Sequence, residues 1–180
     1  MTLLADVVTA SHEVAATRSR SSKVATLAGL LRRLDRQEIV PAVGFLAGAP
    51  RQGRVGVGYA TIYALEHEPA AEPSLAIADL DRAIGTIQET TGSGSAAARR
   101  EILGELLGRA TEDEAGFIRR LFTGELRQGA LAGLMIDAVA KAAGVPGELA
   151  RRALMLSGDL TRTAEIAIAE GADGLREVGF

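Results

Sequence analysis

The 180-residue sequence contains no cysteine and only two histidines, His12 and His67. Without cysteine the chain can form neither disulfides nor thiolate metal sites, and two histidines are too few for a histidine-rich metal centre. No apolar run reaches the roughly 18 residues that a membrane span needs. The first residues, Met1–Val8, lack the basic segment of a signal peptide. These absences predict a soluble cytoplasmic protein with no metal site and no membrane contact.

Aromatic residues make up only 3% of the sequence, although 47% of it is apolar. The apolar residues are mainly Ala, Leu, Val and Ile, which suit packed helices better than a β-sandwich or barrel. Leu27, Leu30, Leu31 and Leu34 recur at helical spacing, and no segment shows the sustained alternation of a strand. The sequence therefore predicts an all-α fold of about ten to twelve helices, near residues 2–17, 21–34, 36–47, 57–66, 76–91, 95–109, 112–123, 131–143, 147–156 and 160–170.

The sequence also contains an internal repeat. Arg51-Gln52-Gly53 recurs as Arg127-Gln128-Gly129, an offset of 76 residues (127 − 51). When residues 4–53 are laid on 80–129, 12 of the 50 positions are identical, where chance would give roughly 4. We therefore predict one domain over residues 1–180, with repeat halves at about 4–66 and 80–142, approximate twofold symmetry between them, and C-terminal helices at 143–180.

Two helix-start signals occupy matching places in this repeat. Asp35 is followed three residues later by Glu38, and Thr111 is followed in the same way by Glu114. A capping residue with a glutamate at the third helical position is typical of a helix N-terminus. The coincidence of the two pairs supports the duplication.

Each repeated loop places an arginine between two glycines. One glycine ends a helix, and the second leaves backbone N–H groups exposed where the next helix begins. Such amides attract an anion together with the helix dipole, and a guanidinium group can form paired hydrogen bonds with a phosphate. The alternative is an ordinary turn whose arginine lies in solvent. Two copies favour a duplex DNA, which presents phosphates on both sides of its minor groove. The predicted contacts are Arg51, Gln52 and Gly53 in the first loop and Gly124, Arg127, Gln128 and Gly129 in the second.

A second pair of repeat-related positions combines hydroxyl groups with basic residues at a helix start. Cations are mildly unfavourable at a helix N-terminus unless an anion binds there, and the alternative is simple serine capping. We predict further DNA contacts from Ser19, Arg20, Ser22 and Lys23 in the first half and from Gly94, Ser95, Arg99 and Arg100 in the second.

The overall charge does not favour nucleic acid binding, and the sequence lacks the known catalytic motifs. The net charge is −3, which argues mildly against nucleic acid binding. Eighteen of the 20 basic residues are arginine, a good phosphate ligand, but a GC-rich genome would give the same bias. No phosphate-binding P-loop and no nucleophile elbow is present. We predict no catalytic residue in the chain.

Three segments resemble the N-terminal domain of ATP-dependent DNA ligases: residues 93–107, 114–129 and 136–142. Residues 45–58 and 144–160 are also similar to the family, so that the resemblance covers nearly the whole chain. The second segment matches the family through Phe117, Ile118, Arg119, Leu121, Gly124, Leu126, Arg127 and Gly129.

The resemblance implies a helical, monomeric domain that grips nicked duplex DNA across the minor groove, through phosphates and without sequence specificity. In the family, the phosphates are contacted by the loop that matches Gly124–Gly129 and by the helix starts that match Gly94-Ser95 and Ser19–Ser22. The role implied is nick sealing in repair, replication or recombination, at the nucleoid of a bacterial cytoplasm. Glu125 stands where the family often has a basic residue, and Thr161 where it commonly has glycine. Both departures indicate weaker DNA affinity.

The resemblance also implies that a full-length ligase uses ATP and Mg²⁺. The catalytic part of such an enzyme needs an OB-fold and a lysine in the motif K-x-D-G, which takes AMP covalently. Lys141-Ala-Ala-Gly144 is not that motif and instead fits the end of a helix. We therefore expect the chain to be the piece that precedes the adenylation and OB-fold domains, with no cofactor of its own.

Two other function classes compete with DNA binding. A helical-repeat scaffold for protein–protein interaction would present a contiguous apolar groove. An independent enzyme would need a catalytic constellation, which the sequence does not offer. An arginine-rich face with few exposed large hydrophobic residues favours DNA binding.

Overall fold

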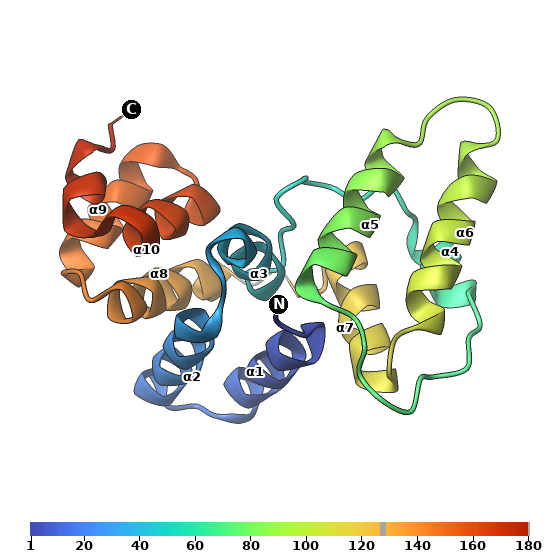
Figure 1. Cartoon of the computed structure of the whole chain (residues 1–180), viewed down its shortest axis with the longest axis horizontal. Helices are drawn as coiled ribbons and strands as arrows, with labels where there is room; N and C mark the ends of the chain where they lie inside the picture. The colour runs from blue at the N-terminus through green and yellow to red at the C-terminus, as the bar shows by residue number, and fades with distance from the viewer. Residues whose placement is uncertain (127–128, 180) are drawn as a thin grey trace.

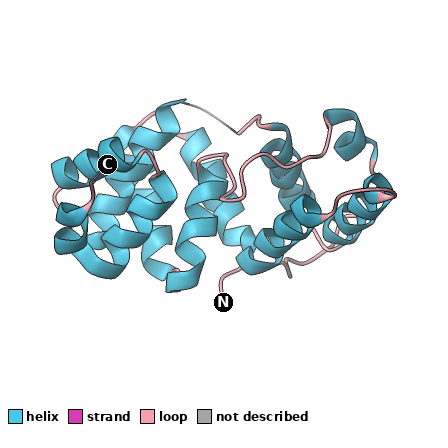
Figure 2. Ribbon diagram, turned by 90° about the horizontal axis from the view of Figure 1, so that it is seen from above, coloured by secondary structure: helices cyan, strands magenta, loops and turns pink. Residues whose placement is uncertain are grey.

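The computed structural model describes residues 1–126 and 129–179, so that Arg127, Gln128 and Phe180 lie outside the described residues, as do the side chains of residues 129 and 130. Within these ranges the chain forms ten α-helices and one 3₁₀-helix and no strand, which confirms the all-α prediction (Figure 2). The elements are α1 (Leu4–Ala16), α2 (Arg20–Arg33), η1 (Arg36–Glu38), α3 (Ile39–Leu46), α4 (Tyr59–Ala64), α5 (Ile77–Glu89), α6 (Ser95–Gly108), α7 (Glu112–Thr123), α8 (Gly129–Ala143), α9 (Gly147–Ser157) and α10 (Leu160–Glu177).

The helices divide into three groups along the long axis of the molecule (Figure 1). Helices α8, α9 and α10 gather at one end, α4 to α7 gather at the other, and α1 to α3 lie between them. Helix α2 packs along α8, and α10 packs against α3, α8 and α9. A single hydrophobic core runs through these contacts. None of the helices in residues 1–126 and 129–179 is long and apolar enough to cross a lipid bilayer.

The helical periodicity seen in the sequence forms this core. Leu27, Leu30 and Leu31 of α2 are buried, and so are the residues of α6 that lie 76 positions later, Leu103, Leu106 and Leu107. Helix α1 packs on α7, and α5 packs on α3, so that the first helix of each proposed half contacts the third helix of the other half. This exchange is what an approximate twofold would produce, and the superposition of the halves stays a prediction.

The two predicted capping pairs, Thr111–Glu114 and Asp35–Glu38, form different side-chain hydrogen bonds. Thr111 and Glu114 form the full reciprocal box: the Glu114 N–H donates to Thr111 Oγ1 at 3.3 Å, and the Thr111 N–H donates to Glu114 Oε2 at 2.7 Å. At the first pair the Asp35 N–H donates to Glu38 Oε1 at 2.9 Å, but the Asp35 carboxylate pairs with the N-terminal ammonium group. Both glutamates are buried, which is rare for a carboxylate and requires such hydrogen bonds.

The last helix is longer than its periodicity indicated. The sequence predicted an end near residue 170, whereas α10 extends to Glu177 across a kink at Gly171. Gly171 has φ 64° and ψ −150°, a conformation that only glycine adopts readily. A glycine commonly ends a helix, but here the backbone turns at Gly171 and continues as helix to Glu177.

Candidate nucleic-acid interface

The first predicted loop connects α3 to α4. Gly48 and Gly53 have φ angles of 75° and 83°, so that both glycines are required by the turn. Arg51 does not extend into solvent: its Nε and one terminal nitrogen each donate to the carboxylate of Asp81 on α5 at 2.8 Å. Gln52 Nε2 donates to the same aspartate. The hydrogen bond that Arg51 donates to Asp81 raises the pKa of Arg51. A phosphate would have to compete with Asp81 for this arginine.

The second predicted loop follows α7. Gly124 ends this helix with φ 79°, as the repeat predicts from Gly48. The predicted contacts Arg127 and Gln128 lie outside the described residues, and Gly129 begins α8. A cleft of about 220 Å³ is lined by Gly48, Pro50, Gly53, Arg54 and Val55 from the first loop and by Leu121, Phe122, Thr123 and Gly124 from the end of α7. The structure therefore brings the first loop beside the end of α7 and Gly124, where the second loop begins.

The start of α2 carries the predicted residues of the first half. Ser19 caps the helix by accepting the N–H of Ser22 at 3.2 Å. Arg20 donates to Asp137 of α8 at 2.8 Å, and Asp137 also accepts from Arg151 of α9 at 2.7 Å. The hydrogen bond from Arg20 is the main cause that lowers the pKa of Asp137. Lys23 is half-buried in the cleft between α2 and α8. Arg20, like Arg51, is thus held by an internal carboxylate.

The start of α6 carries the predicted residues of the second half. Gly94 precedes the helix with φ 78° and gives it no side-chain cap, and Ser95 is its first residue. Arg99 turns back to donate to the Ile87 and Thr90 carbonyl oxygens at the end of α5. Arg100 is exposed and makes no hydrogen bond or ion pair with any described residue.

The backbone at the start of α6 also has hydrogen-bond donors without partners. The N–H groups of Ala96 and Ala97 have no acceptor among residues 1–126 and 129–179, and both residues are exposed. A cleft of about 100 Å³ joins this turn to residues 56–58 and Thr61 at the beginning of α4. The α6 start therefore combines unpaired amides, the positive end of a helix dipole and a free guanidinium group, which is what an anion needs.

Two exposed tyrosines lie on the same side of α4 and were not predicted as site residues. The side chains of Tyr59 and Tyr63 are 62% and 41% exposed. Their rings stack with centroids 4.4 Å apart and an interplanar angle of 29°, and the Arg119 guanidinium lies 5.9 Å from the Tyr63 ring centroid. Burial and the Glu125 charge raise the pKa of Tyr63. The sequence held a signal for this pair, because these are its only two tyrosines and they are four residues apart.

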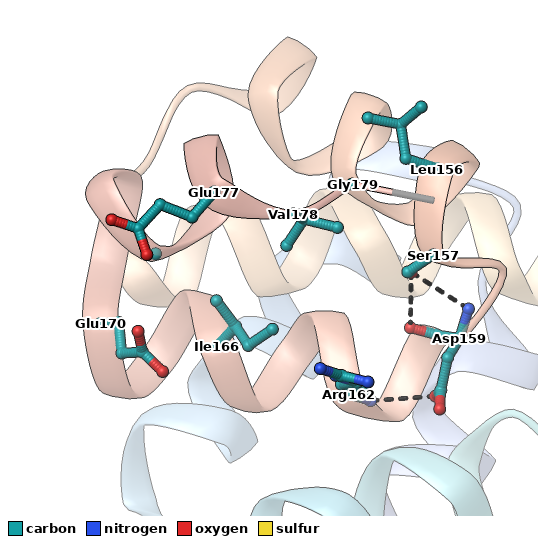
Figure 3. A pocket seen from close by; sticks show the side chains of 10 residues that line it. Leu156, Ser157, Asp159, Arg162, Ile166, Glu170, Glu177, Val178 and Gly179 are labelled. Carbon is teal, nitrogen blue, oxygen red and sulfur yellow. Dashed lines mark hydrogen bonds between the residues drawn. The ribbon is translucent and has the colours of Figure 1, made fainter.

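A separate cavity of about 540 Å³ lies between α9 and α10 (Figure 3). Its polar groups serve the helix start: Asp159 accepts the Arg162 N–H at 3.0 Å, and Ser157 Oγ accepts the Asp159 N–H at 3.2 Å. The carboxylates of Glu170 and Glu177 also line it, and they would repel a phosphate. This cavity contains none of the predicted contact residues and is not part of the candidate interface.

The cap at Asp159 predicts an acid-labile contribution to stability. The backbone hydrogen bond from Arg162 is the main cause that lowers the pKa of Asp159. A carboxylate with a lowered pKa stabilises the fold above the unfolded value of about 3.9, and this contribution disappears as the pH falls through the lowered value. Urea midpoints measured between about pH 5 and pH 2 should fall less steeply in Asp159→Asn, which keeps a capping oxygen. Asp173→Asn, whose carboxylate is exposed, is the control; equal slopes in both variants would contradict the assignment.

Comparison with known proteins gives a consistent family. Residues 63–140 match the family described as DNA ligase N terminus. Over 175 residues the chain is 54% identical to a probable DNA ligase of Saccharopolyspora erythraea, covering 97% of this chain and 34% of that protein. It is 48% identical over 173 residues to a probable DNA ligase of Rhodococcus opacus, covering 96% and 34%.

A third relative, a probable DNA ligase of Pseudarthrobacter chlorophenolicus, is 51% identical over 178 residues, covering 99% of this chain and 35% of that protein. The chain spans about a third of the length of the curated relatives it matches. The resemblance seen in the sequence is thereby confirmed, and the chain belongs to the DNA ligase N-terminal family.

Proposed function

We propose that the chain binds nicked duplex DNA through backbone phosphates on both sides of the minor groove, without sequence preference, as the DNA-gripping part of an ATP-dependent DNA ligase. The observation that carries this proposal is the start of α6, where two unpaired amides and Arg100 lie together at an uncapped helix N-terminus. Its family and its relatives, which are named DNA ligases, supply the context.

The α6 start has no acidic residue in its first turn. The positive end of the helix dipole therefore has no acidic side chain beside it. Arg99 is engaged by the Ile87 and Thr90 carbonyl oxygens, whereas Arg100, in the second turn, has no partner among the described residues. A phosphate would accept hydrogen bonds from the open amides and from the guanidinium group at the same time. The helix start is therefore better suited to a ligand than to solvent.

Internal carboxylates moderate the predicted affinity. Arg51 is paired with Asp81, and Arg20 is paired with Asp137. DNA phosphates must displace these carboxylates or bind the N–H groups of the two arginines that remain free. Each displacement exchanges one charge-assisted hydrogen bond for another, so that the net gain is small. We infer that the isolated chain binds DNA weakly and as a monomer.

The catalytic role belongs to the proposed longer protein. ATP and Mg²⁺ would serve an adenylation domain and an OB-fold that the relatives' greater length can accommodate. A bacterial ligase of this kind would act at the nucleoid during repair, replication or recombination. The chain itself is proposed to position DNA and to show no adenylation or ligation.

The scaffold alternative finds little support on the surface. Among the described residues the exposed large hydrophobic side chains are Met1, Tyr59, Tyr63 and Met155. Met155 belongs to α9 at one end of the molecule, and the tyrosines belong to α4 at the other. A protein-binding groove would need a contiguous apolar patch.

The test is a titration of nicked duplex at several salt concentrations. Each phosphate contact steepens the fall of log K against log salt by about 0.9. Arg100→Ala should flatten the slope by about that amount and weaken binding for every sequence equally. Arg152→Ala, which removes an exposed arginine of α9, is the matched control and should leave the slope unchanged. Equal slopes for wild type and both variants would remove the α6 start from the interface.

A further inference from the structure

The stacked tyrosines of α4 occupy an unusual position for a chain with so few aromatic residues. Helix α4 has six residues and is anchored by Ile62, which is fully buried. Tyr59 and Tyr63 are four residues apart and therefore share a helix face, which here is exposed. The exposed part of such a pair gains nothing from burial in the folded chain, and an exposed aromatic surface is a common mark of a binding site.

The pair is held in place before any ligand arrives. The Tyr63 ring is flanked by Tyr59 on one side and approached by the Arg119 guanidinium group, which also donates to the Leu65 carbonyl oxygen at 3.2 Å. The Tyr63 hydroxyl donates to Glu125 at 3.5 Å. Restrained side chains lose little conformational entropy when a partner packs on them.

Each tyrosine is close to one part of the proposed phosphate interface, Tyr59 along the chain and Tyr63 by a direct contact. The cleft at the α6 start joins Arg99 and Arg100 to Gly58, the residue before Tyr59, and to Thr61 of α4. On the other side Tyr63 contacts Glu125, at the beginning of the loop between α7 and α8. A duplex that reached both places would pass close to α4, on which the tyrosine pair is exposed.

The charges around the two tyrosines make the Tyr59 end of α4 more favourable for DNA than the Tyr63 end. Glu66 and Glu112 line the cleft beyond Tyr63, together with His67. These carboxylates repel phosphates, whereas Arg99 and Arg100 beside the start of α4 attract them. Tyr59, which is the more exposed ring, does not line this acidic cleft, and the residue before it, Gly58, lines the cleft of Arg99 and Arg100.

We propose that Tyr59, supported by Tyr63, packs on the deoxyribose surface that lines the minor groove between the phosphates of the two strands. This inference rests on the proposed DNA binding and adds to it an apolar contact that salt does not screen. Phosphate contacts determine the slope of log K against log salt, whereas burial of apolar surface changes the affinity at every salt concentration alike.

The experiment combines two variants and their controls in the same salt titration of nicked duplex. Tyr59→Ala should weaken binding roughly fivefold at each salt concentration with the slope unchanged, and Tyr59→Phe should bind as wild type does. Met155→Ala, which removes an exposed apolar side chain of α9, should have no effect. Because Tyr59 is largely exposed, the urea midpoint should stay that of wild type.

The outcomes separate this inference from the proposed function. If wild type binds and Arg100→Ala flattens the slope while Tyr59→Ala binds normally, the tyrosine contact is refuted and the phosphate interface remains. If Tyr59→Ala changes the slope, its effect is electrostatic and the inference is also refuted. If wild type shows no affinity for duplex DNA, the proposed function fails and the tyrosine contact fails with it. A preference of Tyr59 for single-stranded DNA, seen as a larger loss on that probe than on duplex, would overturn the minor-groove assignment.

Discussion

Replacing Glu38 with alanine is expected to lower the free energy of unfolding by about 3 kcal/mol or more. The Glu38 carboxylate is only 4% exposed and accepts three hydrogen bonds: from the Thr2 N–H at 2.7 Å, from the Thr2 hydroxyl at 2.8 Å and from the Asp35 N–H at 2.9 Å. Removal of the buried acceptor leaves the three partly buried donors of Thr2 and Asp35 without their partner, and hydrogen bonds to a charged group are the costly ones to lose.

These hydrogen bonds join segments that are far apart in the sequence, so their loss should affect the stability of the whole fold. Thr2 also accepts the Ile77 N–H at 3.0 Å, and Leu4 donates to the Leu75 carbonyl oxygen at 2.8 Å. Glu38 therefore ties the first residues, the start of α3 and the start of α5 together. Loss of one carboxylate should loosen the junction between the two proposed halves.

Urea denaturation followed by circular dichroism measures this effect. Glu13→Ala removes an exposed glutamate from α1 and should change the stability by no more than about 0.5 kcal/mol. Glu38→Gln keeps one acceptor oxygen and should fall between wild type and Glu38→Ala. A loss for Glu38→Ala no greater than that for Glu13→Ala would show that these hydrogen bonds do not hold the junction.

The local features of this fold could be predicted from local sequence patterns. The leucine spacing gave the buried face of α2, and the Thr111–Glu114 pair gave a capping box that the structure reproduces. The repeat predicted a left-handed glycine at Gly124 from the one at Gly48. Each of these depends on residues within a few positions of one another, or on comparison of the chain with itself.

The partners of the predicted arginines could not be found in this way. Asp81 is 30 residues from Arg51, and Asp137 is 117 residues from Arg20. Nothing in the spacing of the sequence brings such residues together, because only the packing of α5 and α8 does so. The tyrosine pair differs, because its four-residue spacing is a local signal. That spacing predicts a shared helix face but does not tell whether the face is buried in the core or exposed.

The charge reversal Glu125→Arg is expected to strengthen binding to nicked duplex about tenfold at low salt and to steepen the salt slope by about 0.9. Glu125 is exposed just after Gly124 and lines a cleft with Lys23 and Arg120. Its carboxylate reduces the attraction of that cleft for a phosphate, and an arginine there would add a donor fork. Random surface changes weaken binding more easily than they strengthen it, so that a gain is the more informative result.

Three controls isolate the local effect from the change in net charge. Glu177→Arg alters the net charge by the same amount on exposed residues of α10, far along the chain from the loop. Glu125→Gln removes only the repulsion and should give a smaller gain without a steeper slope. Tyr63→Phe removes the hydroxyl that contacts Glu125 and should bind as wild type does. If Glu125→Arg and Glu177→Arg shift affinity and slope equally, the effect is one of overall charge, and the loop after α7 does not contact the DNA.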